Sequence, residues 1–311
     1  MGKSKIVGAL PRMPLQVMNY VLAVAEQGSV SSAALCINLT ASALGRQIHQ
    51  LEHELGVTLF ERHSRGARLT HEGEIFVEAA RNMLLRMDRL ASDLDDVHSL
   101  GRGHISIHVS EALVPEYLMP HLTTLVQEHP RITLDVMVST GRRAERALAE
   151  GEADLALIFN ASRNNTLDIA GERECCVVAI VAEHHRLASS HTISAAALLD
   201  DGGLALPPRI YSTRIAFEML LPTELRSSLP HVTINSVAAL KQYARAGVGP
   251  AIVPSFAIAP KTDNDLVQID IEGATSIGTR ICVCRPRHRS LSSAASHLLD
   301  RIKAKLDPAI L

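Results

Sequence analysis

The polar side chains of one predicted helix carry the clearest chemistry in this sequence. In the stretch NLTASALGRQIHQLEHELG, from Asn38 to Gly56, four apolar residues recur at helical intervals and form one stripe: Leu44, Ile48, Leu51 and Leu55. The opposite face, from Ser42 to Gln50, carries small and polar residues without a carboxylate: Ser42, Gly45, Arg46, His49 and Gln50. Such a face is suited to binding a polyanion.

A second source of positive charge follows this helix. The stretch LFERHSRGARLTHEG places three arginines around Gly66: Arg62, Arg65 and Arg68. We expect a short basic hairpin, or wing, that reaches phosphates or a minor groove; an ordinary surface turn is the alternative. Residues 1–71 contain seven Lys or Arg and four acids, whereas the whole chain has a net charge of -2. The excess of positive charge is therefore local.

Other kinds of chemistry find little support. The sequence contains no GxSxG, GxxxxGK[ST], GxGxxG or HExxH pattern. The nearest metal-like group is EHHRLASSH, with Glu183, His184, His185 and His191, and a polar loop is the simpler interpretation of it. Aromatic residues make up only 3% of the chain and Trp is absent, which argues against platforms for stacking single-stranded bases. We expect no catalytic residue, no metal and no cofactor.

Cysteine usage and hydropathy indicate a compartment. No two of the five cysteines form a CxxC pair; they are Cys36, Cys175, Cys176, Cys282 and Cys284. No apolar run is long enough for a membrane span or a secretory signal. We expect free, mostly buried thiols in the cytoplasm and no membrane partner; a redox role for the thiols is the alternative.

The first seventy residues have the spacing of three helices and a turn. Gly28 should end a helix that starts near Leu15, either Ser29 or Ser31 can cap a short second helix, and Thr40 can cap the third. So little chain lies between Ala25 and Thr40 that the helices must pack tightly, as in a helix-turn-helix.

A long helix should follow, over residues 73–100. Its apolar residues step alternately by four and three: Phe76, Ala80, Met83, Met87, Leu90, Leu94 and Val97. A period of 3.5 is typical of a coiled coil, whereas a single helix lying on a globular core is the alternative. The seam predicts a dimer that presents two copies of the helix-turn-helix.

Beyond the hinge GRG at 101–103, strands and helices alternate. Apolar stretches such as HISIHVS, RITLDVMVS and ADLALIF are separated by helical segments, a pattern typical of a parallel sheet built from βαβ units. The residues alone allow either one large sheet or two halves around a cleft.

The whole chain resembles a LysR-type transcriptional regulator. The segments AVAEQGSVSSAA, LTASALGRQIHQLEHELGVTLFER and RGARLTHEG are similar to the winged helix-turn-helix of that family, and ALAEGEADLALIF and ARAGVGPAIVP are similar to its effector domain. The resemblance implies an α/β protein with three parts: an all-α winged helix-turn-helix domain over 14–72, a coiled-coil linker helix over 73–100, and a type 2 periplasmic-binding-protein-like domain over 104–306. That last domain would have two α/β subdomains, the second at roughly 176–279, with a ligand cleft between them.

The resemblance also implies partners. They are double-stranded promoter DNA, an unidentified small-molecule effector, a homodimer or homotetramer, and a contact with RNA polymerase. The residues matching the DNA-binding motif are Ser31, Thr40, Ser42, Arg46, His49, Arg65 and Arg68. Ala41, Gly45 and Ser32 depart from the family pattern. Ser32 stands where Arg is frequent, so we expect one phosphate contact of the family to be missing. Ala41 stands where Gln is usual, which removes an amide that could read adenine, and Gly45 stands where Ser is common. We therefore expect altered base readout.

By the same resemblance, the effector would lie against loops that follow strands and against helix N-termini. The matching residues are Ser110, Glu111, Ser139, Thr140, Phe159, Asn160 and Val248. A carboxylate at Glu111 should disfavour an anionic ligand and favour a cationic or hydrogen-bonding one. A solute-binding or enzymatic α/β protein, with N-terminal helices that only mediate assembly, is the competing interpretation; salt-dependent DNA binding separates the two.

Overall fold

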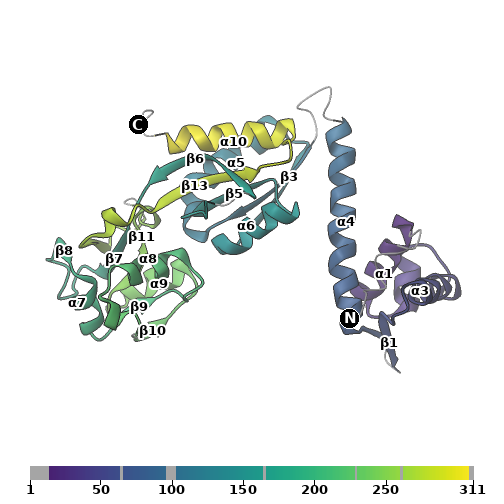
Figure 1. Cartoon of the computed structure of the whole chain (residues 1–311), viewed down its shortest axis with the longest axis horizontal. Coiled ribbons are helices and arrows are strands. Elements are labelled where there is room, and N and C mark those ends of the chain that lie inside the picture. Colours follow the sequence, from purple (N-terminus) through teal and green to yellow (C-terminus); the bar gives the residue numbers. More distant parts are fainter. Residues whose placement is uncertain are drawn as a thin grey trace, which may run out of the picture. The chain divides into compact units, whose positions relative to one another are not determined.

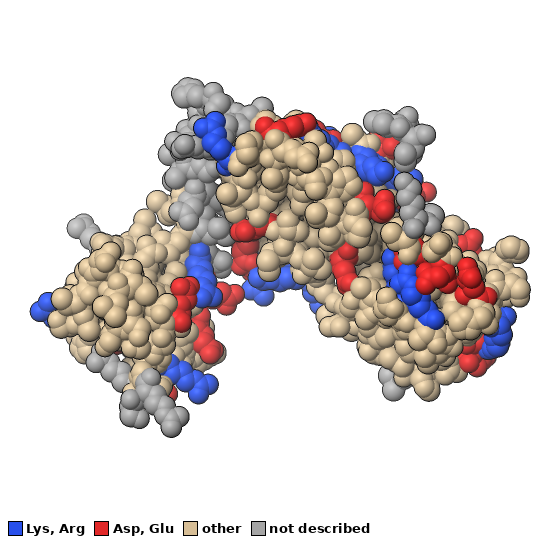
Figure 2. Space-filling model, turned by 180° about the vertical axis from the view of Figure 1, so that it is seen from behind, with Lys and Arg blue, Asp and Glu red and all other residues tan. Residues whose placement is uncertain are grey.

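The structure is a computed structural model that describes residues 14–63, 66–95, 103–163, 166–227, 230–259 and 262–307. The chain divides into two compact units, residues 1–91 and 92–311 (Figure 1). No described helix is long and apolar enough to cross a membrane. On the face drawn in Figure 2, acidic and basic side chains lie close to one another rather than in large fields of one sign.

The first unit contains three short helices, a hairpin and most of a long helix. Its elements are α1 (Leu15–Gln27), α2 (Val30–Cys36), α3 (Ala41–Leu55), β1 (Phe60–His63), β2 (Gly66–Leu69) and α4 (His71–Asp95). The predicted ends are confirmed, since Gly28 ends α1 at φ 64° and Thr40 caps α3. Of the two candidate caps for α2 it is Ser29 that accepts the Ser32 N–H, while Ser31 lies inside the helix. One side of each helix joins a common core that includes Val21, Leu44 and Ile48.

Two glycines permit close backbone packing in this unit. An added Cβ on Gly66 would lie 2.2 Å from the Gly28 carbonyl oxygen, and Ala67 N–H donates to that same oxygen at 2.8 Å. An added Cβ on Gly73 would lie 2.1 Å from the Leu59 carbonyl oxygen. The hairpin and the start of α4 therefore reach their positions only because neither residue has a side chain.

The second unit contains two sheets joined by crossing strands. The first sheet has the order β4 (Ile132–Val138), β3 (Gly103–Val109), β5 (Leu155–Phe159), β13 (Arg280–Pro286) and β6 (Leu167–Glu174). The helices α5 (Met119–Glu128) and α10 (Ser293–Leu306) cover one side of it, and α6 (Gly141–Glu150) covers the other (Figure 1). Before α5 the chain forms a 3-10 turn, Glu111–Leu113, and a π-helical turn, Val114–Leu118, so this helical segment is irregular at its start.

The second sheet uses only residues between β6 and β13. Its order is β10 (Val232–Thr233), β9 (Ala205–Leu206), β11 (Ala251–Pro254), β7 (Val177–Ala182), β12 (Leu266–Ile271) and β8 (Thr192–Ile193). It is covered by α7 (Ala195–Asp200), α8 (Ser212–Met219) and α9 (Val237–Arg245). Further 3-10 turns lie at Thr223–Leu225, Ser255–Ala257 and Ala274–Ile277.

The expectation of a purely parallel sheet is wrong for both sheets. β3 pairs in parallel with β4 and β5, but β13 pairs antiparallel with β5 and β6. In the second sheet, β7 is antiparallel to both β11 and β12. The physical reason is the connectivity: the chain leaves the first sheet after β6 and returns after β12 through β13, so the returning strand enters the first sheet against the direction of β5.

Candidate nucleic-acid interface and ligand cleft

The turn between α2 and α3 presents α3 to solvent on its polar side. Asn38 adopts φ 55°, a left-handed conformation that asparagine tolerates better than most residues, and the chain then enters α3 at Thr40. Thr40 Oγ1 accepts the Ala43 N–H at 3.2 Å and is hydrogen-bonded to Ser42 Oγ at 3.2 Å. The hydroxyl of Thr40 is thus already used to hold the start of the helix.

The polar face predicted for α3 is exposed. Leu44, Ile48 and Leu51 are at most 3% exposed, whereas Ser42, Arg46 and His49 are exposed to solvent. These polar residues line a shallow groove with others of α2 and α3: Val30, Ala41, Ser42, Gly45, Arg46, His49 and Gln50. Ser31 on α2 and Arg68 on β2 are also exposed.

The carboxylates of α3 are engaged within the unit. Glu52 Oε1 accepts the N–H groups of Leu59 at 2.7 Å and Phe60 at 3.1 Å, and so ties the end of α3 to the start of the hairpin. Glu54 accepts from Gln50 Nε2 at 3.0 Å. The first three turns of α3 therefore present no carboxylate to a ligand, which leaves the positive charge of Arg46 unopposed there.

The basic hairpin forms as predicted. β1 and β2 pair antiparallel, with Glu61 opposite Arg68. That acid partly offsets the charge of the wing, a feature that the count of arginines alone did not show. Arg65, at the predicted tip, lies outside the described residues.

The predicted seam along α4 divides into two parts. Phe76 is half-buried against the core of the first unit and Ala80 is 2% exposed, so the unit itself covers both. Met83 and Met87 are 48% and 43% exposed, and their side chains are available to a partner. The side chains of Leu90 and Leu94, and the whole of Val97, lie outside the described part of the chain.

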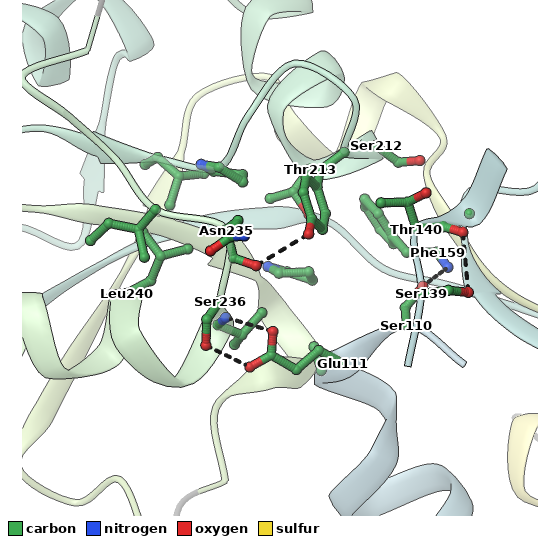
Figure 3. Close-up of a pocket in the computed structure, with 18 of the residues that line it drawn as sticks. Ser110, Glu111, Ser139, Thr140, Phe159, Ser212, Thr213, Asn235, Ser236 and Leu240 are labelled. Carbon is green, nitrogen blue, oxygen red and sulfur yellow. Dashed lines mark hydrogen bonds between the residues drawn. The ribbon is translucent and has the colours of Figure 1, made fainter. Parts of the chain in front are cut away.

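In the second unit, a cleft lies between strand ends of the first sheet and strand ends of the second (Figure 3). Five residues predicted to bind an effector line it: Ser110, Glu111, Ser139, Thr140 and Phe159. Ser110 Oγ accepts the Phe159 N–H at 3.4 Å, and Ser139 Oγ is hydrogen-bonded to His108 Nδ1 at 3.1 Å. Burial and then the nearby Arg143 lower the pKa of His108, which favours the neutral ring at this position.

Two predicted effector residues do not line the cleft. Asn160 turns away after β5 at φ 59°, where its N–H donates to the Arg280 carbonyl oxygen at 2.6 Å. Val248 is 58% exposed in the turn between α9 and β11. Both corrections have the same cause: the positions follow an element in sequence, but the turn sends the side chain outwards.

The second sheet supplies the cleft residues that sequence reasoning missed. They are Pro207, Tyr211, Ser212, Thr213, Asn235 and Ser236, among others. They follow two-residue strands or begin short helices, so they had no hydrophobic periodicity to mark them. The N-cap Ser236, one residue before an apolar helix, was the one usable signal.

Helix N-termini converge on the cleft from both sheets. A Cβ added to Gly141, the first residue of α6, would lie 3.8 Å from the Oγ of Ser212, the first residue of α8. Thr140 caps α6 by accepting the Arg143 N–H at 3.4 Å, whereas Tyr211 gives α8 no side-chain cap. Among the described residues, the first two N–H groups of each helix have no hydrogen-bond acceptor, so they can serve an anionic or carbonyl group.

Glu111 already has partners. Its Oε1 accepts from Ser236 Oγ at 2.9 Å and from Ala238 N–H at 3.1 Å, and its Oε2 accepts from Val237 N–H at 2.9 Å (Figure 3). The N-terminus of α9 already stabilises the charge of this carboxylate, so the charge no longer argues for a cationic ligand over a hydrogen-bonding one.

The metal-like sequence cluster is not where the structure gathers ligands. Within the described segments, the group with suitable spacing is Glu128, His129 and His297, and Arg301 donates to both Glu128 and His297. The guanidinium group of Arg301 thus supplies the positive charge that a metal ion would supply to Glu128 and His297. Burial raises the pKa of Cys175, between β6 and β7, to about 12 and raises that of Cys284 on β13 as well, which favours the neutral thiol at both positions.

Comparisons with known proteins agree over nearly the whole chain. Residues 15–74 match the model of the "Bacterial regulatory helix-turn-helix protein, lysR family", and residues 98–307 match the "LysR substrate binding domain". The "Transcriptional dual regulator GltC" of Bacillus subtilis is 26% identical over 290 residues, which cover 93% of this chain and 96% of that protein. A "Probable RuBisCO transcriptional regulator" of Cyanidioschyzon merolae is 29% identical over 288 residues, which cover 90% and 94%.

Solved structures share the fold. CbnR, in a crystal structure of the full-length protein "complexed with the target DNA complex", aligns with a TM-score of 0.69 at 22% identity over 93% of this chain and 99% of that one. A second structure of CbnR, described as a LysR family transcriptional regulator, aligns with a TM-score of 0.67 at 20% identity over 95% and 100%.

Proposed function

Because this chain belongs to the LysR family of DNA-binding transcriptional regulators, with a winged helix-turn-helix and an effector-binding domain, we propose which of its residues meet DNA and effector. For DNA the proposal is Ser31, Thr40, Ser42, Arg46 and His49 in the major groove, with Arg65 and Arg68 on the wing. The observation that carries it is the exposed face of α3, which has a cation, hydroxyls and an imidazole and whose carboxylates are turned to other partners.

The individual roles follow from the chemistry of each side chain. Arg46 has the reach and the donors to contact a guanine edge or a phosphate. Thr40 holds Ala43 N–H, so it acts on DNA mainly by fixing the start of α3. Ala41 and Gly45 add no polar side chain to the groove on α3, and the methyl group of Ala41 suits contact with a thymine methyl better than with an adenine edge.

For the effector, we propose a small polar ligand held between the first sheet and the second, against Ser110, Ser139, Thr140 and Phe159. The free N–H groups at the starts of α6 and α8 support a ligand with an acid or carbonyl group at that end. The ring of Phe159 supports an apolar body beside it. No catalytic activity is proposed.

For assembly, we propose a homodimer or homotetramer. The exposed Met83 and Met87 on α4 support self-association, as do the exposed apolar residues Val136, Met137 and Val138 on β4, which is an edge strand. Work in the cytoplasm and a contact with RNA polymerase remain parts of the proposal that rest on the family's role in transcription.

The test is fluorescence anisotropy on the duplex upstream of the protein's own gene, at several salt concentrations. We expect Arg46→Ala to weaken binding by about 1–3 kcal/mol if Arg46 reads a base, and to lower the salt slope by about one if it contacts a phosphate. The control is Arg81→Ala, which removes one positive charge from the exposed pair with Glu26 on the same unit. Equal affinities for the two variants, or no preference over random duplex, would refute the assignment.

A further inference from the structure

The carboxylate of Glu111 lies in the cleft and bonds to a helix on the other side of it. Glu111 follows β3 of the first sheet, while Ser236, Val237 and Ala238 begin α9 on the second sheet. Three hydrogen bonds therefore join the two sheets across the cleft through one side chain, and Figure 3 draws the one to Ser236 among them. Charge-assisted bonds of this kind are about twice as strong as neutral ones.

Hydrogen bonds engage the first three N–H groups of α9. Val237 and Ala238 donate to Glu111, Ala239 N–H donates to Ser236 Oγ at 3.3 Å, and Leu240 N–H donates to the Ser236 carbonyl oxygen at 2.9 Å. The N–H groups of the first three residues of α9 are thus engaged, and the bond from Leu240 is the first bond of the helix itself. An external anion could bind at α9 only after displacing Glu111.

The volume of the cleft agrees with an occupied site. About 50 Å³ remains open to a molecule the size of water. Pockets for small-molecule ligands hold about 300–1,000 Å³. Glu111 is one of the contacts that span the two sheets here, beside the ring contacts of Phe256 with Tyr117 and Phe159.

We propose that Glu111 is an internal ligand of the cleft, which takes the place of an acid group of the effector at α9. This inference rests on the proposed effector cleft and narrows its ligand class. The donors left to an external ligand are at the starts of α6 and α8, so the effector carries one acid or carbonyl head directed there. A second acid group directed at α9, as a dicarboxylate would supply, is excluded by Glu111.

The test is rescue by free carboxylates of matched length. Glu111→Ala removes a CH2–COO⁻ group, which acetate replaces, and Glu111→Gly removes one carbon more, which propionate replaces. We expect each variant to lower the Tm of the full chain by roughly 5 °C. At about ten times its Kd, the matched carboxylate should raise the folded-to-unfolded ratio of that variant about tenfold. Chloride at equal ionic strength is the reference.

Two further proteins complete the design. The wild type and Glu116→Ala should respond to either carboxylate less than the Glu111 variants do, because Glu111 still occupies α9 in both and Glu116 is an exposed acid. Glu111→Gln keeps the length but places an amide NH2 where N–H donors point, so it should lose stability and not be rescued. It also serves if the smaller variants fail to fold.

The outcomes separate this inference from the proposed function. Acetate preferred by Glu111→Ala and propionate by Glu111→Gly supports an internal ligand. The same order of preference in both variants, or an equal response in the wild type, overturns it. DNA binding is measured on the same proteins. If the wild type binds DNA specifically but the carboxylates do not rescue the variants, only the inference about Glu111 is refuted. If the wild type shows no specific DNA binding, the proposed function is refuted.

Discussion

Asp263 should be the most sensitive ionised group in the second subdomain. Its side chain is 4% exposed and accepts from Lys241 Nζ at 2.7 Å, from Arg245 at 2.6 Å and from Ala259 N–H at 3.0 Å. It thereby fixes α9, whose N-terminus holds Glu111, to the segment before β12. We therefore expect Asp263→Ala to loosen both the second sheet and the cleft.

The magnitude follows from the burial of the partners. Breaking a buried ion pair by removing one member costs about 3–5 kcal/mol. Lys241 and Arg245 keep 17% and 22% exposure, and Arg245 keeps Asp265, so the low end applies. A loss of about 3 kcal/mol lowers the Tm of a unit of this size by roughly 6–12 °C. The assay is calorimetric unfolding of the full chain.

The matched control is Asp265→Ala. Asp265 also pairs with Arg245, at 2.7 Å, but its side chain is 52% exposed, so its removal should change Tm far less. Equal shifts for Asp263→Ala and Asp265→Ala would refute the argument that burial makes the difference.

The pH dependence gives a second check on Asp263. Burial opposes its ionisation, but hydrogen bonds from Lys241, Ala259 and Arg245 hold the pKa of Asp263 below its usual range. Because the folded-state pKa is lowered, the stabilisation is complete above the unfolded value near 3.9 and is lost as pH falls through the folded value. The Tm difference between wild type and Asp263→Ala should be constant above about pH 5 and narrow below about pH 4. A difference that widens in acid would contradict it.

Two further predictions concern the first unit. Gly73→Ala should lower both the stability of this unit and its DNA affinity, because the new Cβ would lie 2.1 Å from the Leu59 carbonyl oxygen. Urea unfolding measures the stability and fluorescence anisotropy measures the affinity. An unchanged urea midpoint would count against this prediction. Met87→Glu should weaken dimerisation roughly tenfold to a hundredfold by removing the burial of a Met, as measured by sedimentation. Ile75→Glu, also exposed but about a quarter turn off the seam, is its control, and equal effects would argue against the seam.

Local patterns in the sequence were enough to predict the helices of the first unit and their exposed face. The stripe from Leu44 to Leu55, the αL stop at Gly28 and the cap at Thr40 are properties of neighbouring residues, and the structure contains each of them. They predict helix boundaries and the exposed face of α3 because a helix is held by contacts three and four residues apart. The family resemblance, in turn, rested on the longest of these patterns.

Tertiary structure decided what lies far apart in the chain. The direction of β13 depends on how the chain returns from the second sheet, and no local pattern records it. The cleft joins Ser110 and Glu111 to residues a hundred or more positions later, at the ends of strands only two residues long. Their side chains meet because strand ends of the two sheets face one another across the cleft.

Glu111 shows the difference most clearly. As a residue in the sequence it is an isolated carboxylate after a strand, and its charge alone suggested a cationic ligand. In the structure its three donors lie 125, 126 and 127 residues away, at the start of α9. The sequence by itself determined that a carboxylate stands here, and only the tertiary structure decided that a helix N-terminus, rather than a ligand, stabilises its charge.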